Sequence, residues 1–428
     1  MVERAMALGR EAESMIRALA LISAEEGHLT RLYLTPEHRL AADLVRRWMA
    51  EAGLDVSEDA LGTVRGRLAP ESGGRNSVQR LLIGSHIDTV IDAGAYDGAL
   101  GVIAGILAVR EVIKKHGRMP FGIDVLAFGD EEGSRFPATL LCSQAVAGRF
   151  DPASLQVESV DGVKLEDALR AYGKDPAEIP AAAYEPGEAV AYVELHIEQG
   201  PVLEQADEAL GVVTAIASQS RHSVTVVGEA GHAGTVPMNL RRDALAAAAE
   251  VALAVETLAQ RNADDFMVAT IGKLSLSPGA SNVIPARVVF TVDLRSQTDA
   301  RRIEAMNWLR EEILAIARRR RVTAWIERTH EAVARPCDPA LQAGFATTIG
   351  RHGGKSAIHL PSGAGHDGQA VGAMCPIGML FVRCRGGISH NPAEFTSVRD
   401  MGLAVAAMIK FIEGFDPARL GRLRRADD

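Results

Sequence analysis

The chain has 428 residues, of which 47% are hydrophobic and 24% charged, and its formal net charge is −9. This composition is ordinary for a globular protein, and the length favours two domains, because one hydrophobic core rarely serves so many residues. Both signs of charge are mixed along the chain, so the sequence lacks the clustered basic face that a nucleic-acid partner requires.

The cysteines and the N-terminus predict a cytoplasmic protein. The four cysteines lack CxxC spacing, as is typical of reduced thiols; they are Cys142, Cys337, Cys375 and Cys384. The N-terminus interleaves charged and apolar residues, unlike a signal peptide. No apolar run is long enough to cross a bilayer, so we expect no membrane association. The basic tail at residues 419–425 is interpreted as a solvated terminus.

The first part of the chain predicts an α/β architecture. Helices are expected up to Gly53, one of them capped by Thr35, and a turn at residues 70–77. A helix is expected from Gly98 to Lys115. Buried strands are predicted at residues 81–83, 123–128, 191–195 and 379–382. Strands alternating with helices favour a largely parallel sheet. Residues 176–188 are expected to form a surface loop.

A second domain is expected at residues 213–328, inserted into a first domain made of residues 1–212 and 329–428. Its pattern is strand-helix-strand-strand-helix-strand, typical of a ferredoxin-like α+β sandwich. The strands are predicted at residues 221–228, 266–274, 283–294 and 321–327, and the helices at 241–260 and 299–319.

Polar residues follow three of the predicted strands directly. His86 and Asp88 follow the first, the run Asp130–Glu132 follows the second, and His196 follows the third. Ligands of open α/β sheets bind beyond the carboxyl ends of the strands. We therefore expect a functional site at this edge.

Each motif has an ordinary structural interpretation beside the functional one. Asp88 could hold the second ring nitrogen of a metal-bound His86, or the two could be a structural pair. Asp97 could cap the helix that follows it or bridge two metal ions. The three adjacent carboxylates at 130–132 could form a solvated loop, or divide metal binding and proton transfer between them.

The ensemble is more informative than its parts. A lone histidine such as His196 or His390 is usually structural. Two histidines at strand ends, an Asp-Gly turn, a Glu pair and a histidine in a Gly-rich loop together supply nitrogen and oxygen ligands for two divalent ions.

The ordered segments GSHIDTV, YDGALGV, DEEGSRFP, ELHIEQGPVLE, GEAGHAGTVPM, DLRS, SGAGHD and GISHNPAE occur along nearly the whole chain. Together they resemble the dinuclear amidohydrolase family that contains allantoate amidohydrolases and N-carbamoyl-L-amino acid hydrolases. This family belongs to the aminoacylase and carboxypeptidase-like metallopeptidase clan.

The resemblance implies a role for each matching residue. One metal would be held by His86, Asp97 and His196, with Asp97 bridging to a second held by Glu132 and His390. Glu131 would be the general base, and Asp88 would support His86. The ions implied are manganese or zinc, with cobalt and nickel as alternatives.

The resemblance also implies a homodimer whose inserted domain acts as a lid and dimerisation element. His232 would reach the active site of the partner subunit and polarise the scissile carbonyl, although a histidine in so tight a loop could bond only locally. The other substrate contacts implied are Gln199, Asn282, Arg295 and Gly365. The planar fork of Arg295 suits a substrate carboxylate, although alone it could be an ordinary surface residue.

The function implied is metal-dependent hydrolysis of a ureido C–N bond, with allantoate favoured and a role in purine catabolism. Glu131 would take the proton of a metal-bound water and pass it to the leaving nitrogen. An N-carbamoyl-L-amino acid is the alternative substrate, since both carry a ureido group beside a carboxylate. His196 argues against a peptidase, whose branches typically carry a carboxylate there. The complete set of residues argues against a non-catalytic scaffold.

The sequence departs from the family pattern at two places. Cys142-Ser143-Gln144 stands where the family usually has Gly-Ser-Arg, and Gly368 stands where it usually has Ala. Both departures bear on the shape of the pocket rather than on the predicted metal ligands.

Overall fold

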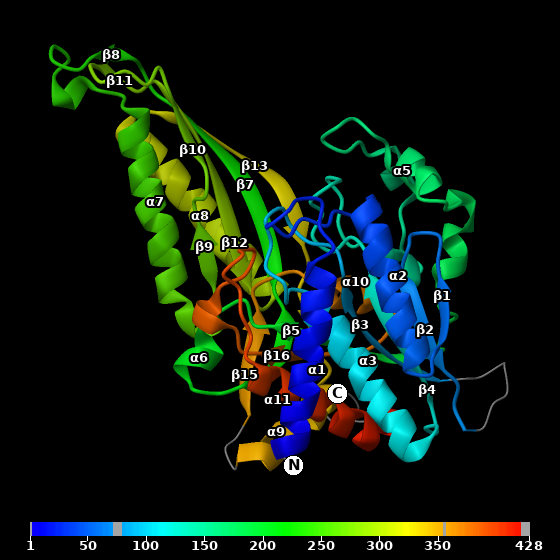
Figure 1. Ribbon diagram of the computed structural model, residues 1–428. Coiled ribbons are helices and arrows are strands. Elements are labelled where there is room, and N and C mark those ends of the chain that lie inside the picture. Colours follow the sequence, from blue (N-terminus) through cyan, green and yellow to red (C-terminus); the bar gives the residue numbers. More distant parts are fainter. Residues whose placement is uncertain (1, 72–78, 354–356, 421–428) are drawn as a thin grey trace. The chain divides into compact units, whose positions relative to one another are not determined.

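The computed structural model describes residues 2–71, 79–353 and 357–420 (Figure 1). The chain divides into a larger unit, Met1–Thr214 with Cys337–Asp428, and an inserted unit, Ala215–Pro336. Most of the turn expected at residues 70–77, and the tail beyond residue 420, lie outside the described residues.

The larger unit is built on a nine-stranded sheet with the order β1-β2-β4-β3-β5-β16-β6-β14, in which β15 also pairs with β6; β14 and the end of β6 fall within the residue range of the inserted unit. The strands are β1 (Asp55–Glu58), β2 (Val64–Leu68), β3 (Arg80–His86), β4 (Gly122–Phe128), β5 (Ala189–Ile197), β6 (Leu210–Ile216), β14 (Arg335–Pro336), β15 (Ile358–Ser362) and β16 (Ile377–Val382). The four central strands β4, β3, β5 and β16 are parallel, so the expected mostly parallel α/β sheet is confirmed.

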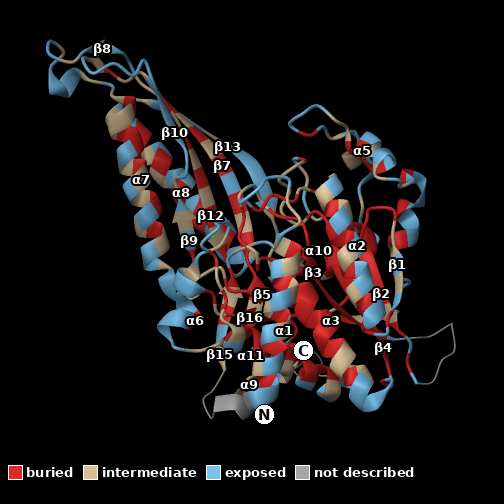
Figure 2. Cartoon of the chain, in the orientation of Figure 1, coloured by how far each residue is buried: buried red, intermediate tan, exposed pale blue. Residues whose placement is uncertain are grey.

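The helices of the larger unit are α1 (Val2–Ala20), α2 (Pro36–Glu51), α3 (Ala99–His116), α4 (Leu141–Val146), α5 (Leu165–Ala171), α6 (Val202–Gln205), α9 (Pro339–Gly353), α10 (Asp367–Val371) and α11 (Val398–Gly414). The helices α2, α3, α9, α10 and α11 pack against the central strands. Every residue of β3 and β4 is buried, as the red strands of Figure 2 illustrate. Burial on both faces explains why these strands are continuous apolar runs instead of alternating patterns.

The inserted unit is an antiparallel sheet with one face covered by two helices. The elements are β7 (Ser218–Val227), β8 (Gly231–His232), α7 (Ala244–Arg261), β9 (Val268–Thr270), β10 (Leu274–Ser277), β11 (Val283–Ile284), β12 (Arg287–Ser296), α8 (Asp299–Arg320) and β13 (Thr323–Ala332). Buried residues alternate along β7 and β12, and the buried set packs with α7 and α8 in one core. Alternation is the mark of a sheet with one covered face.

Two of the strands predicted in this unit are interrupted. Residues 266–274 were expected as one strand, but β9 and β10 pair with β12 on either side of a bulge. Residues 271–273 there oppose only Thr291 and Val292, so one residue is extra. The strand expected at 283–294 is broken at Pro285, which has no N–H to donate to a ladder.

The segment at residues 176–188 is not a plain surface loop. Its first half, Pro176–Ala182, is a 3₁₀ helix with buried Ile179. Buried Tyr184 then donates a hydrogen bond of 2.5 Å to Asp124 on β4. Among the helices of the described ranges, none has both the length and the apolarity needed to cross a membrane.

Candidate active site

The predicted polar residues meet where three adjacent strands end. His86 is the last residue of β3, His196 is the penultimate residue of β5, and Glu131 follows β4. Since β4, β3 and β5 are neighbours and parallel, their carboxyl ends open to the same edge. The hydrophobic runs thus bury the strands, and the residues after them form the site.

Asp97 lies just before α3, but it does not cap that helix. The N-cap residue is Gly98, with φ 61°, and the cap has no side-chain hydrogen bond. A Cβ atom at Gly98 would lie 2.4 Å from Cε1 of His86, so glycine is needed both for this backbone conformation and for the close approach of the ring. The capping interpretation is wrong, and the carboxylate turns towards the histidines.

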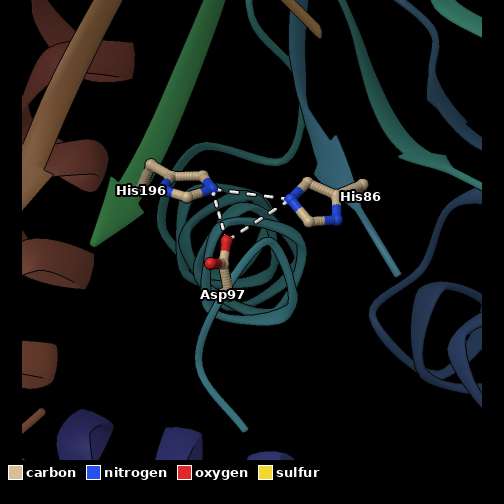
Figure 3. A group of neighbouring side chains, drawn as sticks. All are labelled: His86, Asp97 and His196. Atoms are coloured by element: carbon tan, nitrogen blue, oxygen red, sulfur yellow. Dashed lines mark hydrogen bonds and ion pairs between the residues drawn. The ribbon is translucent and has the colours of Figure 1, made fainter. Parts of the chain in front are cut away.

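His86, Asp97 and His196 form a compact buried group (Figure 3). Oδ1 of Asp97 lies 3.0 Å from Nε2 of His196 and 3.5 Å from Nε2 of His86. The two imidazole nitrogens are themselves 3.5 Å apart. Each histidine thus points one ring nitrogen at a common space beside the same carboxylate oxygen.

A second group uses the other oxygen of Asp97. Nε2 of His390 lies 3.4 Å from Oδ2 of Asp97 and 3.4 Å from Oε2 of Glu132. The potential ligand atoms within each group lie within 4.8 Å of one another. Asp97 therefore belongs to both groups, with one oxygen facing each.

Asp88 contacts both His86 and the loop that carries Glu131 and Glu132. Its Oδ1 lies 3.4 Å from Nδ1 of His86, and its two oxygens accept the backbone N–H groups of Glu131 and Glu132 at 3.1 and 3.2 Å. A carboxylate on the second nitrogen of a ligating histidine fixes the ring and its tautomer. Asp88 also fixes the backbone of the loop that carries the Glu pair.

The pKa values reflect carboxylates crowded into a buried space. Burial and the neighbouring Glu132 raise the pKa of Glu131 well above its ordinary value. Burial and the charge of Asp97 raise the pKa of Glu132 to about 7. Burial opposes protonation of His86, but hydrogen bonds with Asp88 and Asp97 raise its pKa well above the ordinary value. The hydrogen bond with Asp97 raises the pKa of His390 to about 9.

This donor set suits divalent cations. Buried carboxylates are costly without a compensating charge, and imidazole with carboxylate is the ligand combination of zinc, manganese, cobalt and nickel. The two ligand groups share Asp97: one adds two histidines, and the other adds one glutamate and one histidine. Together they fit two such ions.

Glu131 and Gly365 are close together at this edge. The ligand atoms of His86, Glu131 and Glu132 lie within 4.8 Å of one another, and a Cβ atom at Gly365 would be 3.6 Å from Oε1 of Glu131. Gln199, predicted as a substrate contact, also contacts a predicted metal ligand, because its Nε2 donates a hydrogen bond to Oδ2 of Asp97 at 2.8 Å. Its Oε1 is buried and has no partner among the described residues.

Sequence reasoning did not single out two residues that contact Asp97. Ser389 donates its hydroxyl to Oδ2 of Asp97 at 2.7 Å. Oε1 of Glu394 accepts the backbone N–H of Asp97 at 3.0 Å. Both flank His390 in the segment GISHNPAE. The carboxylate of Glu394, four residues after this predicted ligand, could have indicated a role in the site.

Two residues that depart from the family pattern, Cys142 and Gly368, each contact buried groups. Buried Cys142 contacts the carbonyl of Leu61 and the hydroxyl of Tyr33. The N–H of Gly368 donates to buried Glu194 at 3.2 Å. His366, which precedes α10, packs its ring against that of His196 with the centroids 4.5 Å apart.

The predicted contacts on the inserted unit fall into two places. The pairing of β8 with β11 sets His232 opposite Val283, and Asn282 accepts the N–H of Ala233. His232 and Asn282 are both exposed. Arg295 lies near the far end of β12, where its Nε and Nη2 pair with the carboxylate of Asp293 at 3.0 and 3.1 Å.

The comparisons with known proteins agree with this geometry. The pattern of peptidase family M20/M25/M40 matches residues 82–414, a span that holds every predicted metal ligand. The chain belongs to peptidase family M20/M25/M40. The predicted family resemblance is confirmed.

The chain is also similar to curated proteins with two kinds of name. An allantoate deiminase of Arabidopsis thaliana is 41% identical over 94% of this chain and 82% of its own length. An N-carbamoyl-L-amino acid amidohydrolase of Geobacillus stearothermophilus is 41% identical over 89% of this chain and 92% of its own. Among solved structures, an amidase of the hydantoinase/carbamoylase family from Burkholderia multivorans has a TM-score of 0.87 at 32% identity. That comparison covers 94% of this chain and 97% of the amidase.

Proposed function

We propose that this M20 family member holds two divalent ions and hydrolyses a ureido C–N bond in a small substrate that carries a carboxylate. One observation supports this most strongly. Asp97 directs Oδ1 at His196, 3.0 Å away, and Oδ2 at His390, 3.4 Å away. A carboxylate with each oxygen facing a separate ligand group is what a bridging ligand requires.

The ions proposed are manganese or zinc, with cobalt and nickel as alternatives. His86, Asp97 and His196 hold one, and Asp97, Glu132 and His390 hold the other. When bound, such ions lower the pKa of water towards neutrality and polarise a carbonyl oxygen.

Glu131 is the proposed general base and acid. It is a half-buried carboxyl group whose pKa is raised well above the ordinary value by desolvation and by Glu132, and a pKa closer to neutrality suits a group that both accepts and returns a proton. Glu131 takes a proton as water attacks the ureido carbon and delivers it to the nitrogen whose C–N bond breaks. Gly365 leaves room for the substrate beside Oε1 of Glu131.

The substrate contacts proposed are Gln199 in the larger unit, and His232, Asn282 and Arg295 in the inserted unit. Arg295 would bind the substrate carboxylate through its planar fork in place of Asp293, which its Nε and Nη2 contact in this structure. Oε1 of Gln199, which has no partner among the described residues, would accept from a ureido N–H.

The geometry of the inserted unit supports a homodimer. His232 and Asn282 lie beyond the start of β12 and Arg295 lies near its end, as Figure 1 illustrates for β8, β11 and β12. Eight strand residues span about 26 Å, much more than a small ureido acid. One inserted unit therefore cannot offer both places to one molecule, and we propose that His232 of the partner subunit completes the site and polarises the scissile carbonyl.

Allantoate is the proposed substrate, with water consumed and ureidoglycine, ammonia and carbon dioxide released. The second candidate is an N-carbamoyl-L-amino acid, because relatives of both names are 41% identical to this chain. We also propose a cytoplasmic location, which the four buried free cysteines support.

The test is ammonia release from allantoate, run beside N-carbamoyl-L-amino acids, after loading with manganese and again with a chelator. Chelator-sensitive turnover of allantoate well above that of the carbamoyl compounds is expected. The reverse preference would keep the reaction and replace the substrate. Absence of metal-dependent turnover of either compound would overturn the proposed function.

A further inference from the structure

Glu394 is a buried carboxylate that holds the backbone on which Asp97 stands. Its Oε1 accepts the N–H groups of Tyr96 and Asp97 at 2.8 and 3.0 Å, and the residue is 4% exposed. These N–H groups precede Gly98, the N-cap of α3, so Glu394 bonds to the turn before the helix and not to the helix itself.

The turn is shaped to receive this carboxylate. A Cβ atom at Gly94 would lie 2.3 Å from Cδ of Glu394 and 2.4 Å from its Oε1. Any side chain at position 94 would therefore displace Glu394. The N–H of Glu394 in turn donates to the carbonyl of Asn391 at 3.0 Å, which fixes the carboxylate relative to the loop that carries His390.

Three residues of that loop thus act on Asp97. Ser389 donates to its Oδ2 at 2.7 Å, Nε2 of His390 lies 3.4 Å from the same oxygen, and Glu394 holds its backbone. Glu394 itself is in none of the candidate ligand groups found among the described residues. Its contacts are with the backbone of a proposed ligand, which is the position of a residue that acts through another.

We infer that Glu394 is a positioning residue that clasps the Asp97 turn to the His390 loop and so fixes the two candidate ligand groups at the spacing that two ions need. This inference rests on the proposed two-ion function. Because Oε1 only accepts hydrogen bonds here, a glutamine oxygen at the same position should serve, whereas alanine should not.

The experiment measures binding of Mn²⁺ alone to chelator-treated protein by titration calorimetry, and the electron paramagnetic resonance signal of the coupled ion pair. We expect wild-type protein to bind two ions and E394A to bind them about 10- to 100-fold more weakly, the range found when partners of metal ligands are removed. E394Q should bind both ions with an affinity close to that of wild type and keep the coupled signal.

The matched control is Asp59, whose Oδ1 likewise accepts two backbone N–H groups, those of Leu61 and Thr63, at 2.9 and 3.0 Å. D59A removes a similar pair of hydrogen bonds that does not involve Asp97, and the variant should bind two ions as wild type does. G94A reaches the same contact from the other side and should weaken binding as E394A does, which keeps the test decisive if E394A does not fold.

Wild-type affinity in both E394A and G94A would overturn the inference, and so would an E394Q protein as weak as E394A. A wild-type protein that binds fewer than two Mn²⁺ ions would instead overturn the proposed two-ion site itself. The two failures are therefore distinguishable.

Discussion

The larger unit and the inserted unit present their predicted functional residues in opposite ways. In the larger unit, His86 and His196 are each 1% exposed, and their side chains contact Asp97 between them. In the inserted unit, His232 and Asn282 are exposed and lie far along the sheet from Arg295. The first set is preorganised by its own fold, whereas we propose that the second needs a partner subunit to form a site. Mutations in the larger unit should therefore change metal binding, whereas mutations in the inserted unit should lower turnover without loss of metal.

The largest expected effect is on proton transfer in the larger unit. E131Q removes the proposed base but none of the shared contacts of Asp97, so kcat should fall by about 10²- to 10⁴-fold. Binding of two Mn²⁺ ions should persist, as measured by metal analysis after dialysis. Equal loss of metal and activity would mean that Glu131 is needed to hold the ions.

The next effect concerns the inserted unit. H232A should lower kcat by about 10²- to 10³-fold, as the loss of an oxyanion donor does, without loss of metal. If His232 acts across subunits, a 1:1 mixture of H232A and E131Q proteins, exchanged as dimers, should regain about a quarter of wild-type activity, because half of the dimers then hold one intact site.

A mixture that stays as inactive as its components would show that His232 acts within its own subunit, or not at all. Refolding each variant with itself controls for the exchange procedure. In either case the inserted unit would not complete the active site of the partner subunit.

The pH dependence of metal binding sharpens the account of the larger unit. The hydrogen bond with Asp97 raises the pKa of His390 in the metal-free protein to about 9. Below that pH the His390 imidazole carries a proton that a metal must displace, so affinity for Mn²⁺ should rise as the pH increases from 7 towards 9, by about tenfold per pH unit for each proton displaced. Titration calorimetry at several pH values measures this, and a pH-independent affinity would contradict it.

The smallest effect is expected at a departure from the family pattern. C142G places glycine in α4 and removes a buried side chain, which together should lower the free energy of unfolding by about 2 kcal/mol. Urea unfolding measures this loss, and kcat should stay close to wild type. A247G, at a buried position in α7 of the inserted unit, is the matched control. A large loss of kcat in C142G alone would show that Cys142 shapes the pocket.

Much of the larger unit could be predicted because its physics is local in sequence. Continuous apolar runs indicated the buried parallel strands, and polar residues directly after them indicated the site edge. In the inserted unit the bulge at residues 271–273 could not be predicted, because it depends on which strand lies opposite.

The connections through Asp97 could not be predicted from composition or spacing. An Asp-Gly pair before a helix favours capping, and only the fold shows that Gly98 admits the ring of His86 and turns the carboxylate towards it. The contact between Glu394 and Tyr96 spans 298 residues, so no local pattern contains it. The assignment of ligand roles came from family resemblance and stays a proposal.

The most direct test of the central claim is a Mn²⁺ titration of chelator-treated wild-type protein beside D97A. If Asp97 is shared by the two ligand groups, wild type should bind two ions and D97A should lose high affinity for both, because one substitution removes a ligand from each. A D97A protein that still binds one ion with wild-type affinity would show that the groups are independent, and would contradict the account.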